Sequence, residues 1–121
     1  EKQVAAFAIT HTDENGYLKD IIEKPGADAV KKFADEKGVV RVSMNIFRFD
    51  GKMIYDYVKN CPLNPVRKEK ELPTAILNMI RENPKSMKGI PICEHVPDLT
   101  RKEDILKVRD YLKQKNINLN W

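Results

Sequence analysis

Residues 3–23, QVAAFAITHTDENGYLKDIIE, decide the fold of this chain. Gln3 to Thr10 is a short apolar run typical of a buried strand, and Asp13 to Gly16 (DENG) is a strong turn signal. Tyr17 to Glu23 indicates a second strand. The stretch therefore predicts a β-hairpin or two neighbouring strands, within a sheet that is mixed rather than wholly parallel.

Further helices and strands follow this pair along the chain. Alternation from Val39 to Phe49 predicts a strand whose apolar face carries Val42 and Ile46. Apolar residues at steps of three and four predict helices, one of them capped by Asp50 and one opened by Pro73. In all, helices are expected over 27–37, from 50 to the Pro62 loop, from 72 to 83 and from 100 to about 115. A further strand is expected over 87–93. This order indicates an α/β layer fold, with a mixed sheet flanked by helices.

The composition is that of one soluble globular domain. Of 121 residues, 41% are hydrophobic and 33% are charged, and no apolar run approaches the roughly 20 residues that cross a bilayer. Two cysteines are too few for a disulfide scaffold, so we expect a cytoplasmic protein with reduced thiols. The net charge of +4 comes from basic residues interspersed with acids, which permits an anionic ligand without requiring nucleic acid.

Acidic and basic residues stand at positions where ligands bind in other proteins. Glu23 and Lys24 end a strand in Glu-Lys-Pro, which offers a carboxylate for hydroxyls beside an ammonium for phosphate; an ordinary exposed strand end explains the same pattern. Asp98 lies between a strand and a helix, where an acid either holds magnesium against phosphate oxygens or helps to cap the helix. Glu69 and Glu71 either reach a ligand from a loop or belong to a solvated charge run.

Four motifs follow one another in a fixed order. They are Ile22-Glu23-Lys24-Pro25, Val42-Ser43-Met44-Asn45-Ile46-Phe47, Glu69 to Leu72-Pro73 at the start of a helix, and Asp98 before Thr100-Arg101-Lys102-Glu103-Asp104. Together they resemble the C-terminal half of the sugar-1-phosphate nucleotidyltransferases, or nucleotide-diphospho-sugar pyrophosphorylases. The resemblance covers roughly residues 1 to 115 and implies the sugar-binding part of a nucleotide-diphospho-sugar transferase fold.

The resemblance implies a role for each matching residue. Glu23 would bind sugar hydroxyls and Lys24 the sugar phosphate. A glutamate upstream of the Leu-Pro helix, Glu69 or else Glu71, would also bind the sugar. Asn45 stands where many members have glycine, and it would hydrogen bond to the sugar or narrow the pocket. Asp98 would bind the catalytic magnesium ion, although Val96 replaces the tryptophan of the family's Trp-x-Asp motif.

The resemblance also implies that residues 1–121 are one partial domain of a longer protein. The family's Gly-rich loop and first metal aspartate, which serve the nucleoside triphosphate, have no counterpart here, and no nucleophile is visible. The complete enzyme would bind a nucleoside triphosphate and a sugar 1-phosphate. An oxygen of the sugar phosphate would attack the α-phosphorus in line and release pyrophosphate. We expect this chain alone to be inactive.

Two other classes remain open from the residues. Val96 in place of tryptophan favours a catalytically inactive regulatory or assembly module. A pI of about 9.0 favours a small basic nucleic-acid binder, which the interspersed acids oppose. With the N-terminal half of the family's domain missing, an unpaired sheet edge and apolar surface predict that the isolated chain forms a homodimer or aggregates.

Overall fold

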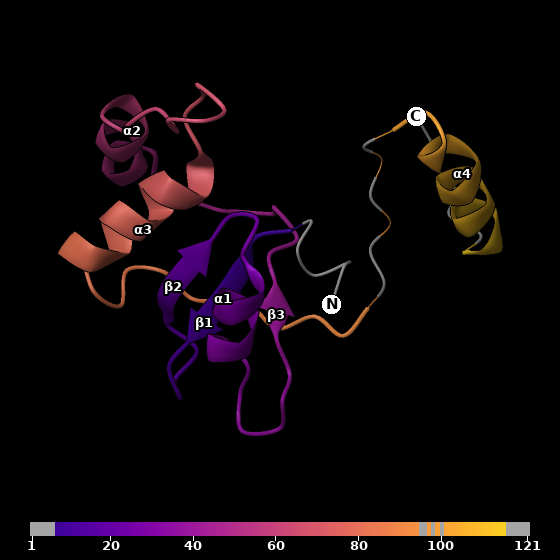
Figure 1. Ribbon diagram of the computed structural model, residues 1–121, viewed down its shortest axis with the longest axis horizontal. Coiled ribbons are helices and arrows are strands. Elements are labelled where there is room, and N and C mark those ends of the chain that lie inside the picture. The colour runs from indigo at the N-terminus through magenta and orange to yellow at the C-terminus, as the bar shows by residue number, and fades with distance from the viewer. Residues whose placement is uncertain (1–6, 95–96, 98, 100, 116–121) are drawn as a thin grey trace. The chain divides into compact units, whose positions relative to one another are not determined.

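The computed structural model describes residues 7–94, 97, 99 and 101–115 (Figure 1). Contacts within the chain divide it into two units, Glu1–Pro91 and Ile92–Trp121. Among the described residues, the first unit holds the sheet and helices α1 to α3, and the second holds helix α4. The prediction of one partial domain over residues 1–121 stays a prediction.

A three-stranded sheet organises the first unit. Strand β1 (Ile9–Thr12) pairs with β2 (Leu18–Ile22) on one side and with β3 (Arg41–Val42) on the other, in the order β2-β1-β3. Both pairings are antiparallel. The predicted combination of helices with a sheet is confirmed, whereas the predicted mixed sheet is wrong for the described strands.

The connections explain why the described sheet is antiparallel. A tight turn reverses the chain between β1 and β2. The chain then passes through α1 (Ala27–Lys32) to the far side of β1, where β3 also runs against β1 (Figure 1). With β1 in the middle, the two outer strands never pair with each other, and no parallel ladder forms between them.

The turn predicted at Asp13 to Gly16 is confirmed. The Asp13 carboxylate accepts hydrogen bonds from the backbone N–H groups of Asn15 and Tyr17, at 3.0 and 2.8 Å. Gly16 has a φ of +81°, a left-handed conformation that glycine adopts without a steric penalty. The turn therefore fixes the register that buries Leu18.

The strand predicted over residues 39–49 is confirmed only over Arg41–Val42. Beyond β3, the Ser43 N–H donates to the Ala8 carbonyl at 2.7 Å and Ser43 is buried, whereas Ile46 is 75% exposed. The predicted apolar face is therefore wrong at these positions. The cause is Asn45, whose φ of +54° ends the extended backbone on which the alternation depends.

The helix predicted over residues 27–37 ends earlier, at Lys32. After it, Asp35 organises a turn by accepting hydrogen bonds from the N–H groups of Lys37 at 3.0 Å and Val39 at 2.9 Å. The bond from Val39 is the main cause that lowers the pKa of the Asp35 carboxyl. Gly38, with a φ of +74°, closes this turn instead of the helix.

The strand predicted over residues 87–93 does not form as a strand. Leu18 donates its N–H to the Met87 carbonyl and Gly89 donates to the Gly16 carbonyl, both at 2.9 Å. The pairing stops after this short contact, and Pro91 has no N–H with which to extend a ladder.

Helix α2 (Gly51–Lys59) begins as predicted at Asp50. The Asp50 carboxylate accepts the N–H groups of Lys52 at 2.9 Å and Met53 at 3.2 Å, which would otherwise lack partners at the helix start. The N-cap prediction is confirmed.

Helix α3 (Leu72–Glu82) begins with Pro73 in its first turn and packs against β2, as its apolar stripe predicts. It also packs on α2, where the Tyr57 hydroxyl donates to Glu82 at 2.7 Å and accepts from Asn83 at 2.8 Å. The bond to Glu82 raises the pKa of Tyr57. The buried cluster between α3 and the sheet consists of Ala8, Leu18, Ile21, Ile76, Met79 and Ile80.

The second unit contains α4 (Asp104–Gln114). The Asp104 carboxylate accepts the N–H of Arg101 at 2.9 Å near the start of this helix. Thr100, which begins the predicted helix, lies outside the described residues. None of the helices in the described part of the chain is long and apolar enough to cross a membrane.

Candidate functional site

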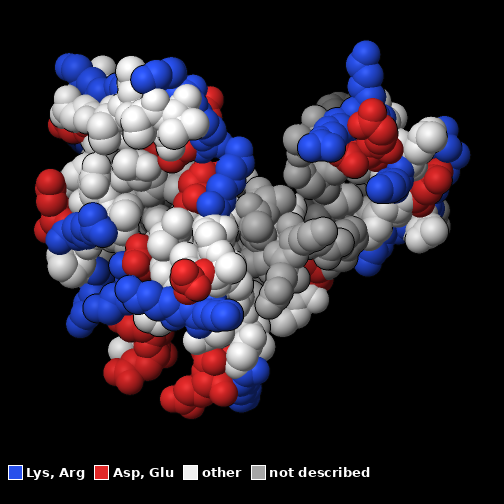
Figure 2. All heavy atoms as spheres, viewed as in Figure 1, with Lys and Arg blue, Asp and Glu red and all other residues white. Residues whose placement is uncertain are grey.

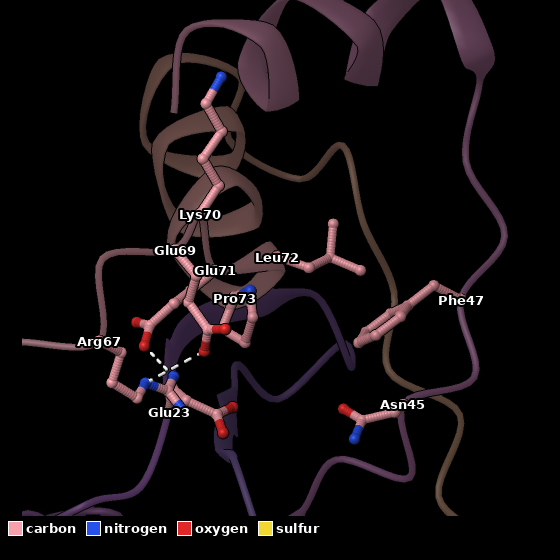
Figure 3. Close-up of a pocket in the computed structure, with 9 residues that line it drawn as sticks. All are labelled: Glu23, Asn45, Phe47, Arg67, Glu69, Lys70, Glu71, Leu72 and Pro73. Atoms are coloured by element: carbon pink, nitrogen blue, oxygen red, sulfur yellow. Dashed lines mark hydrogen bonds and ion pairs between the residues drawn. The ribbon is translucent and has the colours of Figure 1, made fainter. Parts of the chain in front are cut away.

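A pocket of about 340 Å³ in the first unit is lined by residues from distant parts of the sequence (Figure 3). One comes from the end of β2, two from the segment between β3 and α2, and the others from the loop before α3 and its first turn. The lining residues are Glu23, Asn45, Phe47, Arg67, Glu69, Lys70, Glu71, Leu72 and Pro73. The pocket therefore brings together Glu23, Asn45 and Glu69, which the sequence names as candidate ligand-binding residues.

Glu23 is positioned by the strand that precedes it. Ile21 is buried in the core and Pro25 is buried two residues after Glu23, so the strand end is held on both sides. Lys24 between them has a φ of +45° and is exposed. Lys24 is not among the residues that line the pocket. The chain reversal at Lys24 therefore separates the carboxylate, which lines the pocket, from the ammonium, which does not.

Asn45 is held in its left-handed conformation by Ser43. The buried Ser43 hydroxyl accepts the Asn45 N–H at 3.2 Å and lies 3.5 Å from the Asn45 side-chain oxygen. Asparagine and glycine tolerate this backbone conformation better than other residues do. In Figure 3 the side chains of Asn45 and Glu23 point toward one another across the pocket.

The loop before α3 is fixed by its own hydrogen bonds. The Asn64 side-chain oxygen accepts the N–H groups of Val66 at 2.9 Å and Arg67 at 3.0 Å, and the Asn64 N–H donates to the Glu69 carbonyl at 2.8 Å. The Lys70 ammonium donates to the carbonyls at the C-terminal end of α2, including that of Val58 at 3.2 Å. A cation at that helix end is favourable, because the last carbonyls have no partner within the helix.

An arginine joins the two glutamates of this loop. The Arg67 guanidinium pairs with Glu71 and lies 3.4 Å from the Glu69 carboxylate. Glu71 also accepts a hydrogen bond from the Asn64 side chain at 2.9 Å, and its side chain is 11% exposed. The Glu69 side chain is 59% exposed. Glu71 is therefore engaged by the loop, whereas Glu69, although paired with Arg67, is the more exposed of the two carboxylates.

Arg67 and Phe47 were not expected at the site from the sequence. Arg67 lies in a run of charges, whose ordinary interpretation is a solvated surface. Its spacing of four residues from Glu71 was no signal, because such pairs meet predictably only on a helix, and Arg67 lies in the loop before α3. Phe47 is half-buried and stacks on Phe49 with ring centres 5.6 Å apart, and it adds an apolar wall to the pocket together with Leu72.

Carboxylates and a carboxamide beside an apolar wall suit a ligand that carries several hydroxyl groups. Carboxylates accept hydrogen bonds from hydroxyls, and the Asn45 amide can both donate and accept. The two cations in the lining are already engaged, Arg67 by glutamates and Lys70 by α2. The exposed Lys24 is the nearest candidate in sequence for a phosphate contact beside the pocket.

The magnesium expectation receives no structural test. Asp98, its expected ligand, lies outside the described residues. Among the residues that the structure does describe, no group of three or more histidine, cysteine or acidic side chains could hold a metal ion.

One curated protein resembles about half of this chain. It is a glucose-1-phosphate adenylyltransferase of Bradyrhizobium diazoefficiens, with 36% identity over 61 residues, which is 50% of this chain. The matched stretch spans 14% of that enzyme, so the chain corresponds to a small part of its length. By its name the relative is a sugar-1-phosphate nucleotidyltransferase. No protein-family model matches the chain, and neither does a solved structure.

Proposed function

We propose that this chain is the sugar-phosphate-binding part of a sugar-1-phosphate nucleotidyltransferase. The observation that carries the proposal is the convergence of Glu23, Asn45 and Glu69 on one pocket from three separate segments. The similarity to a glucose-1-phosphate adenylyltransferase supports the same class of enzyme.

Each residue of the site has a role in this proposal. Glu23, Asn45 and Glu69 hydrogen bond to the hydroxyl groups of the sugar, and Lys24 contacts its phosphate outside the pocket lining. Arg67 and Glu71 hold the loop that presents Glu69. Hydrogen bonds at several hydroxyls fix the orientation of the ring and therefore the direction of its phosphate.

The rest of the reaction requires groups from a longer protein. The nucleoside triphosphate binds to those groups of the longer protein. An oxygen of the sugar phosphate then attacks the α-phosphorus of the triphosphate, and pyrophosphate is released. Asp98 would supply one carboxylate ligand to a magnesium ion, which would neutralise charge on the phosphates. The location in this proposal is the cytoplasm, where the thiols of Cys61 and Cys93, both free in the structure, stay reduced.

The charge distribution favours this proposal over nucleic-acid binding. On the face shown in Figure 2, lysine and arginine side chains lie interspersed with acidic ones. Nucleic acid is bound by a continuous basic surface, because several phosphates must be neutralised at once.

Calorimetric titration of the chain with glucose 1-phosphate tests the binding role. We expect binding that is weakened at least about tenfold by Glu23→Ala and by Lys24→Ala, because each change removes a charge-assisted hydrogen bond. Glu36→Gln, an exposed carboxylate outside the pocket, is the matched control. Absence of binding by the unmodified chain would refute the proposal.

An assay of pyrophosphate release tests the proposal that this chain is part of a magnesium-dependent enzyme. In the longer protein, release of pyrophosphate should require magnesium, and Asp98→Asn should lower kcat strongly because an amide is a poorer magnesium ligand than a carboxylate. The 121-residue chain alone should release none. Normal turnover by Asp98→Asn would show that the metal is held elsewhere, and turnover by the short chain would refute the assignment of a partial enzyme.

A further inference from the structure

The pocket contains more negative charge than free positive charge. Three carboxylates line it, those of Glu23, Glu69 and Glu71, together with the cations of Arg67 and Lys70. Arg67 is paired with both glutamates of its own loop. The Lys70 ammonium is bonded to the carbonyls of α2, and Figure 3 shows its side chain pointing away from the carboxylates.

Glu23 is the carboxylate that remains without a cation. Within the described part of the chain its side chain has no ion pair and no hydrogen bond, and it points toward Asn45. The Asn45 amide carries no charge, so the negative potential of Glu23 acts directly on whatever occupies the space between them.

Resting on the proposed function, we infer that this site selects sugar 1-phosphates with uncharged ring substituents and rejects those of hexuronic acids. Lys24 directly follows Glu23 and is exposed, and in the proposed function it binds the phosphate while the ring faces Glu23 and Glu69. A hexose and its hexuronic acid differ by a hydroxymethyl group against a carboxylate of nearly the same size. Rejection would therefore come from charge and not from shape.

Separate titrations with two such ligands test the inference. The 121-residue chain is titrated by calorimetry with glucose 1-phosphate and with glucuronic acid 1-phosphate, at neutral pH and low ionic strength. We expect the second ligand to bind at least about tenfold more weakly, which is the effect of one like charge at a few ångströms in a partly solvated site. High salt should reduce the ratio of the two affinities, because exposed charges are screened.

Two variants test whether Glu23 causes the discrimination between the two ligands. Glu23→Gln keeps the shape of the side chain and should bring the two affinities closer by several-fold, whereas Glu36→Gln should leave the ratio unchanged. Equal affinities in the unmodified chain would overturn the inference and leave the proposed function standing. Failure of both ligands to bind would overturn both. An unchanged ratio in Glu23→Gln would overturn the assignment to Glu23.

Discussion

Replacement of Glu71 by glutamine should separate the structural glutamate of the pocket from the ligand-binding one. Glu71→Gln keeps the size of the side chain but removes the negative charge that pairs with Arg67. Removing one partner of a fully buried ion pair costs about 3–5 kcal/mol, and an exposed pair contributes at most about 1 kcal/mol. The side chains are 11% and 28% exposed, so we expect a loss of about 2 kcal/mol.

Glu69→Gln is the matched comparison on the same arginine. The Glu69 carboxylate is 3.4 Å from Arg67 and its side chain is 59% exposed, so its loss should cost less than about 0.5 kcal/mol. Its effect should appear in ligand binding, where we expect about tenfold weaker affinity for glucose 1-phosphate.

Thermal unfolding followed by circular dichroism measures the first effect and calorimetric titration the second. For a domain of this size, about 2 kcal/mol corresponds to a fall in Tm of about 10 °C. Glu71→Gln should show that fall, whereas Glu69→Gln should unfold close to the unmodified protein. Equal Tm values for the two variants, or a stability loss confined to Glu69→Gln, would refute the distinction between the two glutamates.

Three further predictions concern the rest of the first unit. Asn45→Ala should lower stability by about 1 kcal/mol because of the φ of +54°, while Asn45→Gly should not, as urea unfolding would show. The Asp35 pKa is lowered below 3.8, mainly by the hydrogen bond from the Val39 N–H. The stability that this carboxylate contributes is present above pH 3.8 and is lost as the pH falls through the lowered pKa. Asp35→Asn should therefore reduce the loss of stability with falling pH in acid unfolding curves. The isolated chain should self-associate, because β3 is an edge strand of the described sheet; a light-scattering mass of 14.0 kDa at high concentration would contradict this.

Local signals in the sequence predicted the starts of α2 and α3, whereas α1 ends at Lys32, before the predicted end at residue 37. The Asp50 cap and the Pro73 start both act through groups within one turn of the helix end, so neighbouring residues suffice to predict them. The strands were predicted less well, because a strand exists only where a partner is available. Alternation continues past Val42, but pairing with β1 stops there and Asn45 turns the backbone away.

The residues that line the pocket were predicted only in part, and their ligand-binding roles stay predictions. Glu23, Asn45 and Glu69 were named from motifs, and the structure gathers them. The roles of Glu69 and Glu71 could not be separated, since two acids two residues apart look alike in a charge run. What distinguishes them is the partner across the loop, because the Asn64 side chain bonds to Glu71.

Two of the residues named as candidates from the sequence have a left-handed backbone conformation. Lys24 and Asn45 have φ values of +45° and +54°, in the region where a side chain costs about 1 kcal/mol relative to glycine. Lys24 also precedes Pro25, and proline disfavours compact conformations in the residue before it. Glycine at either position would relieve the strain. Lys68 and Lys85 have similar φ values of +57° and +65° outside the pocket lining, so a positive φ alone does not mark a ligand-binding residue.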